Sequence, residues 1–295
     1  MPKPLQRRLD AALSAWLDAP GVPRVDFATP VGAPALLAPD SVTWRVMKNP
    51  IALIVGGIAA VILELAEPRV AAGVWEHTTF RTDPVGRMKR TGHAAMVTIY
   101  APVETARAMI EGVSRRHARI AGKTAAGVAY RADDPELLDW VQATASFGFL
   151  EAYCRYAHAL SLAERGRFYA EAAPIAALYG ATGAPGSSAA LKELFGRMQP
   201  KLSNSAIVRG FLSILAQSDF LPPPLAPLRS AMIAAAIAIV PDWTRDLLGL
   251  KPRMPPGGET LLRALGAAGE RITLRSAPPA QACVRLNLPA DYLYR

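Results

Sequence analysis

The chain has 295 residues, of which 51% are hydrophobic and 7% aromatic, with 33 basic against 24 acidic residues. This length allows one or two domains with a large core. The net charge of +9 would suit an anionic partner. However, the sequence has no run of five basic residues and no basic–aromatic motif, which argues against nucleic-acid binding.

Three further features bear on the cellular location. Cys154 and Cys283 are too few for a disulfide framework, and no CxxC motif is present. The longest apolar run, from Ile51 to Leu63, stops at Glu64 and is shorter than the roughly 20 residues that cross a bilayer. The start of the chain is amphipathic and does not resemble a secretory signal. We therefore expect a cytoplasmic protein without a transmembrane segment.

Apolar residues recur at helical spacing along almost the whole chain, and Pro and Gly mark the breaks. Capping signals at Asp83-Pro84, Asp134-Pro135 and Ser161–Glu164 indicate helix starts. The segment 122–133 lacks the helical pattern, and a short hairpin could form there around Ala126-Gly127. We expect helices at about 3–18, 41–47, 50–65, 68–78, 84–99, 103–121, 134–157, 161–179, 188–199, 204–216, 225–239, 241–248 and 258–270.

These elements predict an all-α fold, a single multi-helix bundle domain of about a dozen helices over residues 41–270. Residues 1–40 would form an N-terminal helix and arm. Residues 271–295 would form a C-terminal tail that is extended or loosely docked, because this segment alternates weakly and holds three prolines. Gly56-Gly57 lies inside a helical pattern and indicates a close contact between two helices.

The sequence contains four histidines. His117 falls on the apolar stripe of the helix expected at 103–121, where an imidazole can bind a metal or donate to a carbonyl inside a packed core. His77 and His158 stand near helix ends, which favour an imidazolium, and His93 lies on a mixed face. No Glu-x-x-His, His-x-x-x-His or zincin motif is present, so a non-haem iron or zinc site is poorly supported.

Arg87 and Thr91 stand four residues apart in the helix expected at 84–99 and so share a face. A guanidinium can bind a carboxylate through two hydrogen bonds, and a hydroxyl can donate to a carboxylate or to bound oxygen. An ion pair between Arg87 and Asp83, which are also four residues apart, is the alternative for this arginine.

Four segments carry a resemblance to a known family: TWRVMKNP at 43–50, ELAEPRVAAGVWEHTTFRTDPVGRMKRT at 64–91, GVSRRHARIAG at 112–122 and YRADDPELLDWVQAT at 130–144. In this order and spacing they resemble the haem-dependent oxygenase family that includes the bacterial rubber oxygenase and the fungal mycophenolic acid pathway oxygenase.

The resemblance implies a b-type haem whose iron is bound by His117. It also implies that Arg87, Arg90 and Thr91 lie at the haem, with the arginines at its propionates and Thr91 polarising oxygen. The activity implied is that of an oxygenase acting with dioxygen on a small apolar, unsaturated substrate. The sequence leaves the oligomeric state open.

This chain departs from the family pattern at two positions. The rubber oxygenase has a lysine that can occupy the distal side of the iron, and here that place holds Arg90, whose guanidinium has no free lone pair. Glu67 stands where many bacterial relatives have histidine. It is a candidate acid or base if it is buried with a raised pKa, and a helix cap or a surface carboxylate is the equal alternative.

Two alternatives remain open from the sequence. Trp75, Phe147, Phe149 and Tyr153 could line an apolar substrate pocket, although plain core packing explains them as well. The whole chain could also be a non-catalytic all-α protein that binds haem or an apolar ligand without turnover, and its basic amphipathic surfaces would let it sit on anionic membranes.

Overall fold

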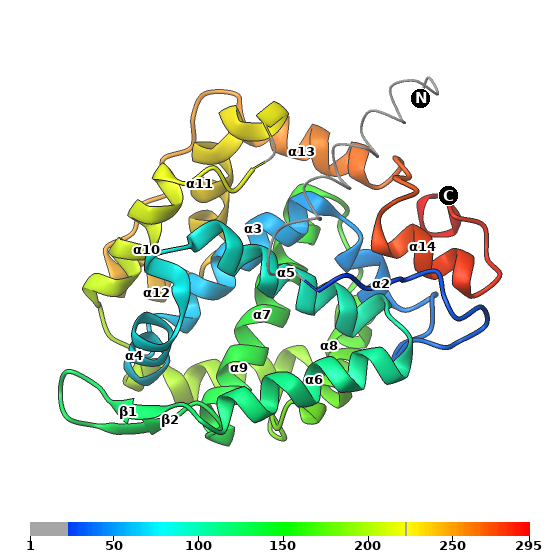
Figure 1. Cartoon of the computed structure of the whole chain (residues 1–295). Helices are drawn as coiled ribbons and strands as arrows, with labels where there is room; N and C mark the ends of the chain where they lie inside the picture. Colours follow the sequence, from blue (N-terminus) through cyan, green and yellow to red (C-terminus); the bar gives the residue numbers. More distant parts are fainter. Residues whose placement is uncertain (1–22, 222) are drawn as a thin grey trace.

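The computed structural model describes residues 23–221 and 223–295. The helix expected at 3–18 lies outside the described residues. Within them the fold is all-α, as the sequence predicts: of thirteen α-helices, two form a central pair and eleven surround it, with one two-stranded sheet at the edge (Figure 1). None of these helices could cross a bilayer alone by length and composition, whereas two sharply bent helix pairs meet the criteria jointly.

The α-helices follow the expected ranges closely. Their bounds are α2 (Val42–Met47), α3 (Pro50–Glu64), α4 (Pro68–His77), α5 (Pro84–Tyr100), α6 (Val103–His117), α7 (Pro135–Tyr156), α8 (Leu162–Leu178), α9 (Ser188–Met198), α10 (Ala206–Gln217), α11 (Arg229–Ile239), α12 (Asp242–Leu248), α13 (Gly258–Gly269) and α14 (Pro278–Arg285). Short 3-10 turns lie at Thr79–Arg81, Gln199–Lys201, Pro223–Leu228 and Tyr292–Tyr294.

The centre of the molecule is the crossing of α3 and α7 (Figure 1). A Cβ atom built on Gly56 would lie 2.7 Å from the carbonyl oxygen of Gly148, so the two backbones touch. Only glycine permits this approach. The predicted close contact is therefore confirmed at Gly56, whereas Gly57 faces the ring of Phe149 at ordinary van der Waals distance.

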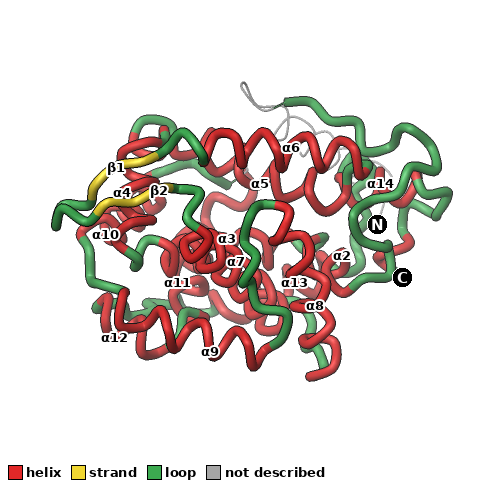
Figure 2. Tube along the Cα trace, turned by 90° about the horizontal axis from the view of Figure 1, so that it is seen from below, coloured by secondary structure: helices red, strands yellow, loops and turns green. Residues whose placement is uncertain are grey.

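Helices α5 and α6 form a helical hairpin along one side of this core. Figure 2 shows them next to each other along one edge of the molecule, with α9 and α12 along the opposite edge. Asp83 caps α5 by accepting from the Gly86 amide at 2.9 Å, and Pro84 occupies its first position. The turn at Ala101-Pro102 ends α5 and starts α6, because proline cannot continue the preceding helix.

The expected hairpin is present and changes the end of α6. Strands β1 (Ala121–Lys123) and β2 (Ala129–Arg131) pair in antiparallel register, and Gly127 in the turn has a φ of 80°. The helix expected to run to 121 stops at His117, because the chain enters the strand pairing a few residues later. His117 therefore ends α6 and does not lie mid-helix.

The prediction of a loosely docked C-terminal tail is wrong. Residues from Pro278 form α14, and the side chain of Arg285 is fully buried. Its guanidinium donates to the carbonyl oxygens of Ala33, Phe27 and Tyr100 at 2.9, 2.7 and 2.7 Å. The sequence pattern did not predict this docking, because the segment is held by hydrogen bonds from the buried Arg285 guanidinium to three carbonyls far away in the chain.

A buried polar network closes the same end of the bundle. The Tyr153 hydroxyl donates to Glu270 Oε2 at 2.6 Å, and the Lys48 ammonium lies 3.2 Å from the same oxygen. Lys48 also donates to the backbone carbonyl of Leu293 at 2.6 Å. Lys48 and Glu270 therefore form an ion pair, which offsets the cost of burying the two charges.

Candidate functional site

The predicted haem arginines sit in the first turns of α5 but have different partners. Arg87 donates to the hydroxyl of Thr91, one turn further on. Arg90 instead donates to Asp83 at 3.1 Å and to the Thr79 hydroxyl at 2.6 Å. The expected alternative, an ion pair of Arg87 with Asp83, is therefore not formed, and Arg87 has no carboxylate within ion-pair distance among the described residues.

His117 lies at the C-terminal end of α6, half-buried, with its Nδ1 atom enclosed and lacking a hydrogen-bond partner in the described structure. Burial lowers the pKa of this imidazole below its ordinary value of 6.5, and the charges of Arg116 and Arg87 lower it further. The ring is therefore neutral at neutral pH, and a neutral imidazole is the form that binds a metal.

Arg87 and His117 lie towards the same end of the α5–α6 hairpin, and the charge of Arg87 lowers the pKa of the imidazole. The guanidinium comes from the N-terminal part of α5 and the imidazole from the C-terminal end of α6, which the antiparallel hairpin brings to one end. The structure thus brings together two of the predicted cofactor residues, and Thr91 joins them through its hydrogen bond to Arg87.

Glu64 is a third ionisable group here, and the sequence did not predict it. Burial raises the pKa of its carboxyl from 4.5 to about 7, and the nearby Arg87 opposes that rise. Its signal in the sequence was the single charge that ends the apolar run Ile51–Leu63. A carboxyl with this pKa can take up and release a proton near neutral pH.

Three of the nine buried polar atoms without a partner in the described residues belong to the α5–α6 hairpin. His93 Nε2 on α5 and both Ser114 Oγ and His117 Nδ1 on α6 are buried without a hydrogen-bond partner in the described residues. Ser114 and His117 are three residues apart and so lie on the same side of α6. Buried polar groups normally have partners, so this seam has capacity for a polar or metal-containing ligand.

Glu67 occupies a different position from the one proposed for an acid or base. Its carboxylate caps α4 by accepting from the Val70 amide at 2.9 Å and pairs with Arg69 at 2.7 Å. Arg69 in turn donates to Glu136 at 2.7 Å. Both oxygens of Glu67 are thus engaged, which favours the helix-capping alternative for this residue.

The other histidines have the structural surroundings expected of them. His77 ends α4 and its Nε2 lies 3.2 Å from the Tyr130 hydroxyl, which also contacts Glu76 at 3.2 Å. His158 follows the end of α7 and is exposed. Burial lowers the pKa of His93, so this ring is also neutral at neutral pH.

The four aromatic residues considered for a substrate pocket pack in separate places. Trp75 lies against Gly210 of α10, and the Phe147 ring lies 5.4 Å from that of Phe195 on α9. Phe149 packs near Gly57, and the hydroxyl of Tyr153 binds Glu270. Plain core packing therefore accounts for them.

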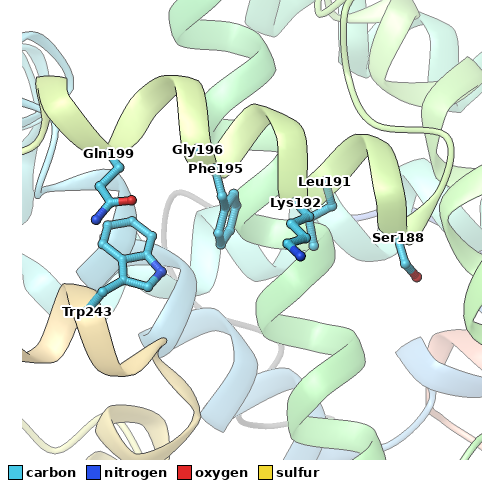
Figure 3. Close-up of a pocket in the computed structure, with 7 residues that line it drawn as sticks. All are labelled: Ser188, Leu191, Lys192, Phe195, Gly196, Gln199 and Trp243. Atoms are coloured by element: carbon cyan, nitrogen blue, oxygen red, sulfur yellow. The ribbon is translucent and has the colours of Figure 1, made fainter.

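Two cavities are described, of about 350 and 310 Å³. The larger lies between α9 and α12, with Trp243 facing Gln199 and Phe195 (Figure 3). The smaller lies between α10 and α11 and includes Arg229 and Ile233. Neither includes His117 among its lining residues.

The residues at the α5–α6 hairpin fit the donor set of a b-type haem. A neutral imidazole with an unpartnered nitrogen can bind iron, and a nearby arginine without a carboxylate partner can bind a propionate. His117, Arg87 and Thr91 would hold the group. Arg90 is occupied by Asp83 and Thr79, so it would contribute only by positioning the start of α5.

Comparison with known families gives one match. The model of the family described as ER-bound oxygenase mpaB/B′ and rubber oxygenase, catalytic domain, matches residues 44–270. No curated protein and no solved structure matches the chain. The matched range includes α3, α5 and α6, and so covers all the residues of the site described above.

Proposed function

Because this chain belongs to the family of mpaB-type and rubber oxygenase catalytic domains, we propose that it is a b-type haem-dependent oxygenase. In this proposal it acts with dioxygen on a small apolar, unsaturated substrate. The family itself supports an oxygenase that uses a substrate and oxygen. The haem, the substrate class and the roles of individual residues are parts of the proposal.

The observation that carries the proposal is the state of His117. This imidazole is neutral at neutral pH, half-buried, beside Arg87 and unpartnered at Nδ1. A histidine with only a packing role would normally donate to a carbonyl or a carboxylate. The combination favours a ligand that accepts a nitrogen lone pair and carries acidic groups within reach of a guanidinium.

Each residue has a role that its surroundings allow. His117 would bind the metal, Arg87 would bind a propionate, and Thr91 would accept from Arg87. The Thr91 hydroxyl donates to the Arg87 carbonyl at 3.0 Å, and it would have to turn away from that carbonyl to donate to oxygen. Bound haem would supply the redox-active iron on which oxygen chemistry depends. Glu64, with a pKa of about 7, would hold or release a proton next to Arg87.

Two observations support the proposed substrate class and location. The α3 face that leads to Glu64 is formed by Ile54, Gly57 and Val61, all apolar and only partly buried. Such a surface can orient an apolar chain and exclude water. The thiols of Cys154 and Cys283 are both free, which supports a reducing compartment, and we propose the cytoplasm.

Reconstitution with haem tests the proposal. The purified protein should bind haem and show an intense absorption band in the violet, and His117→Ala should abolish the band. The matched control is His77→Ala, since His77 lies on α4, outside the α5–α6 hairpin, and its ring contacts the Tyr130 hydroxyl. Protein that stays colourless with added haem, or a band that survives His117→Ala, contradicts the proposal.

Oxygen uptake separates an oxygenase from a protein that only binds haem. The loaded protein should consume oxygen when an unsaturated hydrocarbon is added, and Glu64→Gln should slow turnover without removing the absorption band. If haem binds and no unsaturated hydrocarbon causes oxygen uptake, the non-catalytic alternative replaces the enzymatic one.

A further inference from the structure

We infer that the β1–β2 hairpin, with the basic residues at its base, docks this protein on the surface of an anionic lipid bilayer. The hairpin projects beyond the helices at one end of the molecule in both views (Figure 1, Figure 2). The docking itself does not depend on haem binding.

The hairpin tip is apolar and uncovered. We define the tip as residues 125–128, Ala-Ala-Gly-Val, all of which are exposed. Val128 is 53% exposed, which makes it one of the few large hydrophobic side chains left in water in the described structure. Isolated exposed apolar residues are common, so the exposed tip indicates a binding surface only together with the residues around it.

Basic residues lie in the two strands, at the end of α6 and in the link between them, and we call these residues the collar. All of its members are exposed: Arg115, Arg116, Arg119, Lys123 and Arg131. The acidic neighbours are Glu111, 3.6 Å from Arg115, Asp133, 2.8 Å from Arg131, and Glu76, 3.2 Å from the Tyr130 hydroxyl of β2. Among the described residues, no carboxylate lies within ion-pair distance of Arg116, Arg119 or Lys123.

Part of the tip's backbone is already hydrogen-bonded within the turn. The Gly127 amide donates to the Thr124 carbonyl, and the Thr124 amide to the Val128 carbonyl, both at 2.8 Å. The Val128 amide donates to the Thr124 hydroxyl at 3.2 Å. Backbone groups paired within the turn do not have to be stripped of water at the membrane.

The hairpin is held rigidly against the body of the protein. The Tyr130 hydroxyl on β2 contacts His77 and Glu76 of α4, both at 3.2 Å. A Cβ atom at Gly122 on β1 would collide with that hydroxyl at 2.6 Å, so the tyrosine lies directly over the glycine. A fixed apolar tip can therefore be presented to a surface without an ordering cost.

Charge and composition favour lipid over nucleic acid. A cationic collar around an apolar tip matches phosphate headgroups above acyl chains. The tip has no aromatic ring on which a base could stack. Since α6 leads from His117 directly into the hairpin, docking would also bring the proposed oxygenase site towards the phase in which apolar substrates dissolve.

Vesicle sedimentation of the full chain tests the inference without haem or substrate. Protein should sediment with vesicles of phosphatidylcholine plus phosphatidylserine, less with phosphatidylcholine alone, and less at high salt. Arg119→Gln combined with Lys123→Gln should lower the partition coefficient about 20-fold. Val128→Asp should lower it about tenfold, because it replaces an inserting side chain with a charge that the surface repels.

The opposite end of the molecule supplies matched controls. Arg271→Gln with Arg275→Gln removes the same charge from exposed positions near α14, and Val284→Asp changes a valine that is 49% exposed there. Both controls should bind vesicles as the unchanged protein does. Far-ultraviolet circular dichroism should show that every variant keeps its helices.

Three results would overturn the inference. Wild-type protein could fail to bind anionic vesicles at low salt, or the controls could lose as much binding as the hairpin variants. Third, binding to a DNA oligonucleotide could match binding to vesicles and depend on Arg119 and Lys123 but not on Val128. That outcome would identify a general polyanion surface. None of these results bears on haem binding by His117.

Discussion

The point where α3 and α7 cross differs from the α5–α6 hairpin in what it buries, although α7 also carries polar atoms at Trp140 and Tyr156 that are unpartnered in the described structure, away from the crossing. At the crossing, the Gly56 and Gly148 backbones are in contact, and apolar side chains such as Val55 and Leu150 are fully buried. In the hairpin, His93, Ser114 and His117 carry buried polar atoms without partners, and Arg87 lacks a carboxylate.

The difference separates stability from function within one bundle. A closely packed helix crossing tolerates no added volume. Buried polar groups without partners lower the stability of the fold, but they remain available to bind a ligand. Variants at the crossing should therefore act on folding, and variants in the hairpin on ligand binding. The following predictions test that division.

The largest effect should come from filling the crossing. Gly148→Ala would drive a methyl group into the Gly56 backbone, so we expect a loss of about 3 kcal/mol or more in the free energy of unfolding. Gly57→Ala is the control, since its Cβ would lie 3.8 Å from the Phe149 ring. Denaturant unfolding should show the control to be as stable as wild type; equal losses would refute the close contact.

Glu64→Gln should stabilise the protein at high pH. The folded-state pKa of about 7 lies above the ordinary 4.5, so the folded protein binds more protons between these values and its stability falls as pH rises through this window. Above pH 7 the free energy of unfolding of the variant should be about 2 kcal/mol higher than that of wild type. This value is reduced because the Glu64 side chain is only partly buried. Below pH 4.5 the two should coincide.

Unfolding measured at several pH values checks this linkage. A constant difference between wild type and Glu64→Gln across the whole range would show that the carboxyl is not buried as described. The effect would then belong to the exposed surface and not to the seam beside Arg87.

Arg87→Leu and Arg90→Leu should separate the two arginines. Arg87 is free to bind a propionate, so its loss should weaken haem affinity about tenfold, the value of one charge-assisted hydrogen bond. Arg90 is held by Asp83 and Thr79, so its loss should change haem affinity less than the loss of Arg87. Haem titration followed by absorption measures both, and the reverse order would assign the propionate to Arg90.

The smallest effect concerns two tyrosines on α7. Tyr153→Phe removes a hydrogen bond to Glu270 and should cost about 1 kcal/mol. Tyr156→Phe removes a buried hydroxyl that has no partner in the described structure, and it should be neutral or stabilising. Thermal unfolding of the pair distinguishes matched from unmatched groups on a single helix. Equal destabilisation would indicate that Tyr156 has a partner after all.

Local signals in the sequence determined the fold class and the helix ranges. Caps such as Asp83 and Asp134, each followed by proline, act within one turn, so they can be read from neighbouring residues alone. The hairpin around Gly127 was predictable for the same reason. The placement of Arg87 and Thr91 on one face of α5 also needed only helical geometry.

What the sequence did not reveal depends on residues far apart in the chain. The docking of α14 rests on Arg285 reaching Phe27, Ala33 and Tyr100, contacts that no local pattern encodes. The alternative prediction of an ion pair between Arg87 and Asp83 was wrong, because Asp83 pairs with Arg90. The conformation of the preceding turn decides which arginine reaches Asp83.

By itself, the sequence determined an all-α bundle and the residues of the family's oxygenase domain, because helix periodicity, caps and motif spacing are local properties. Only the tertiary structure decided that Glu64 lies near Arg87 with a pKa of about 7, and that Glu67 caps a helix with both oxygens engaged. Burial and charge proximity set these properties, and both arise only when distant helices pack together.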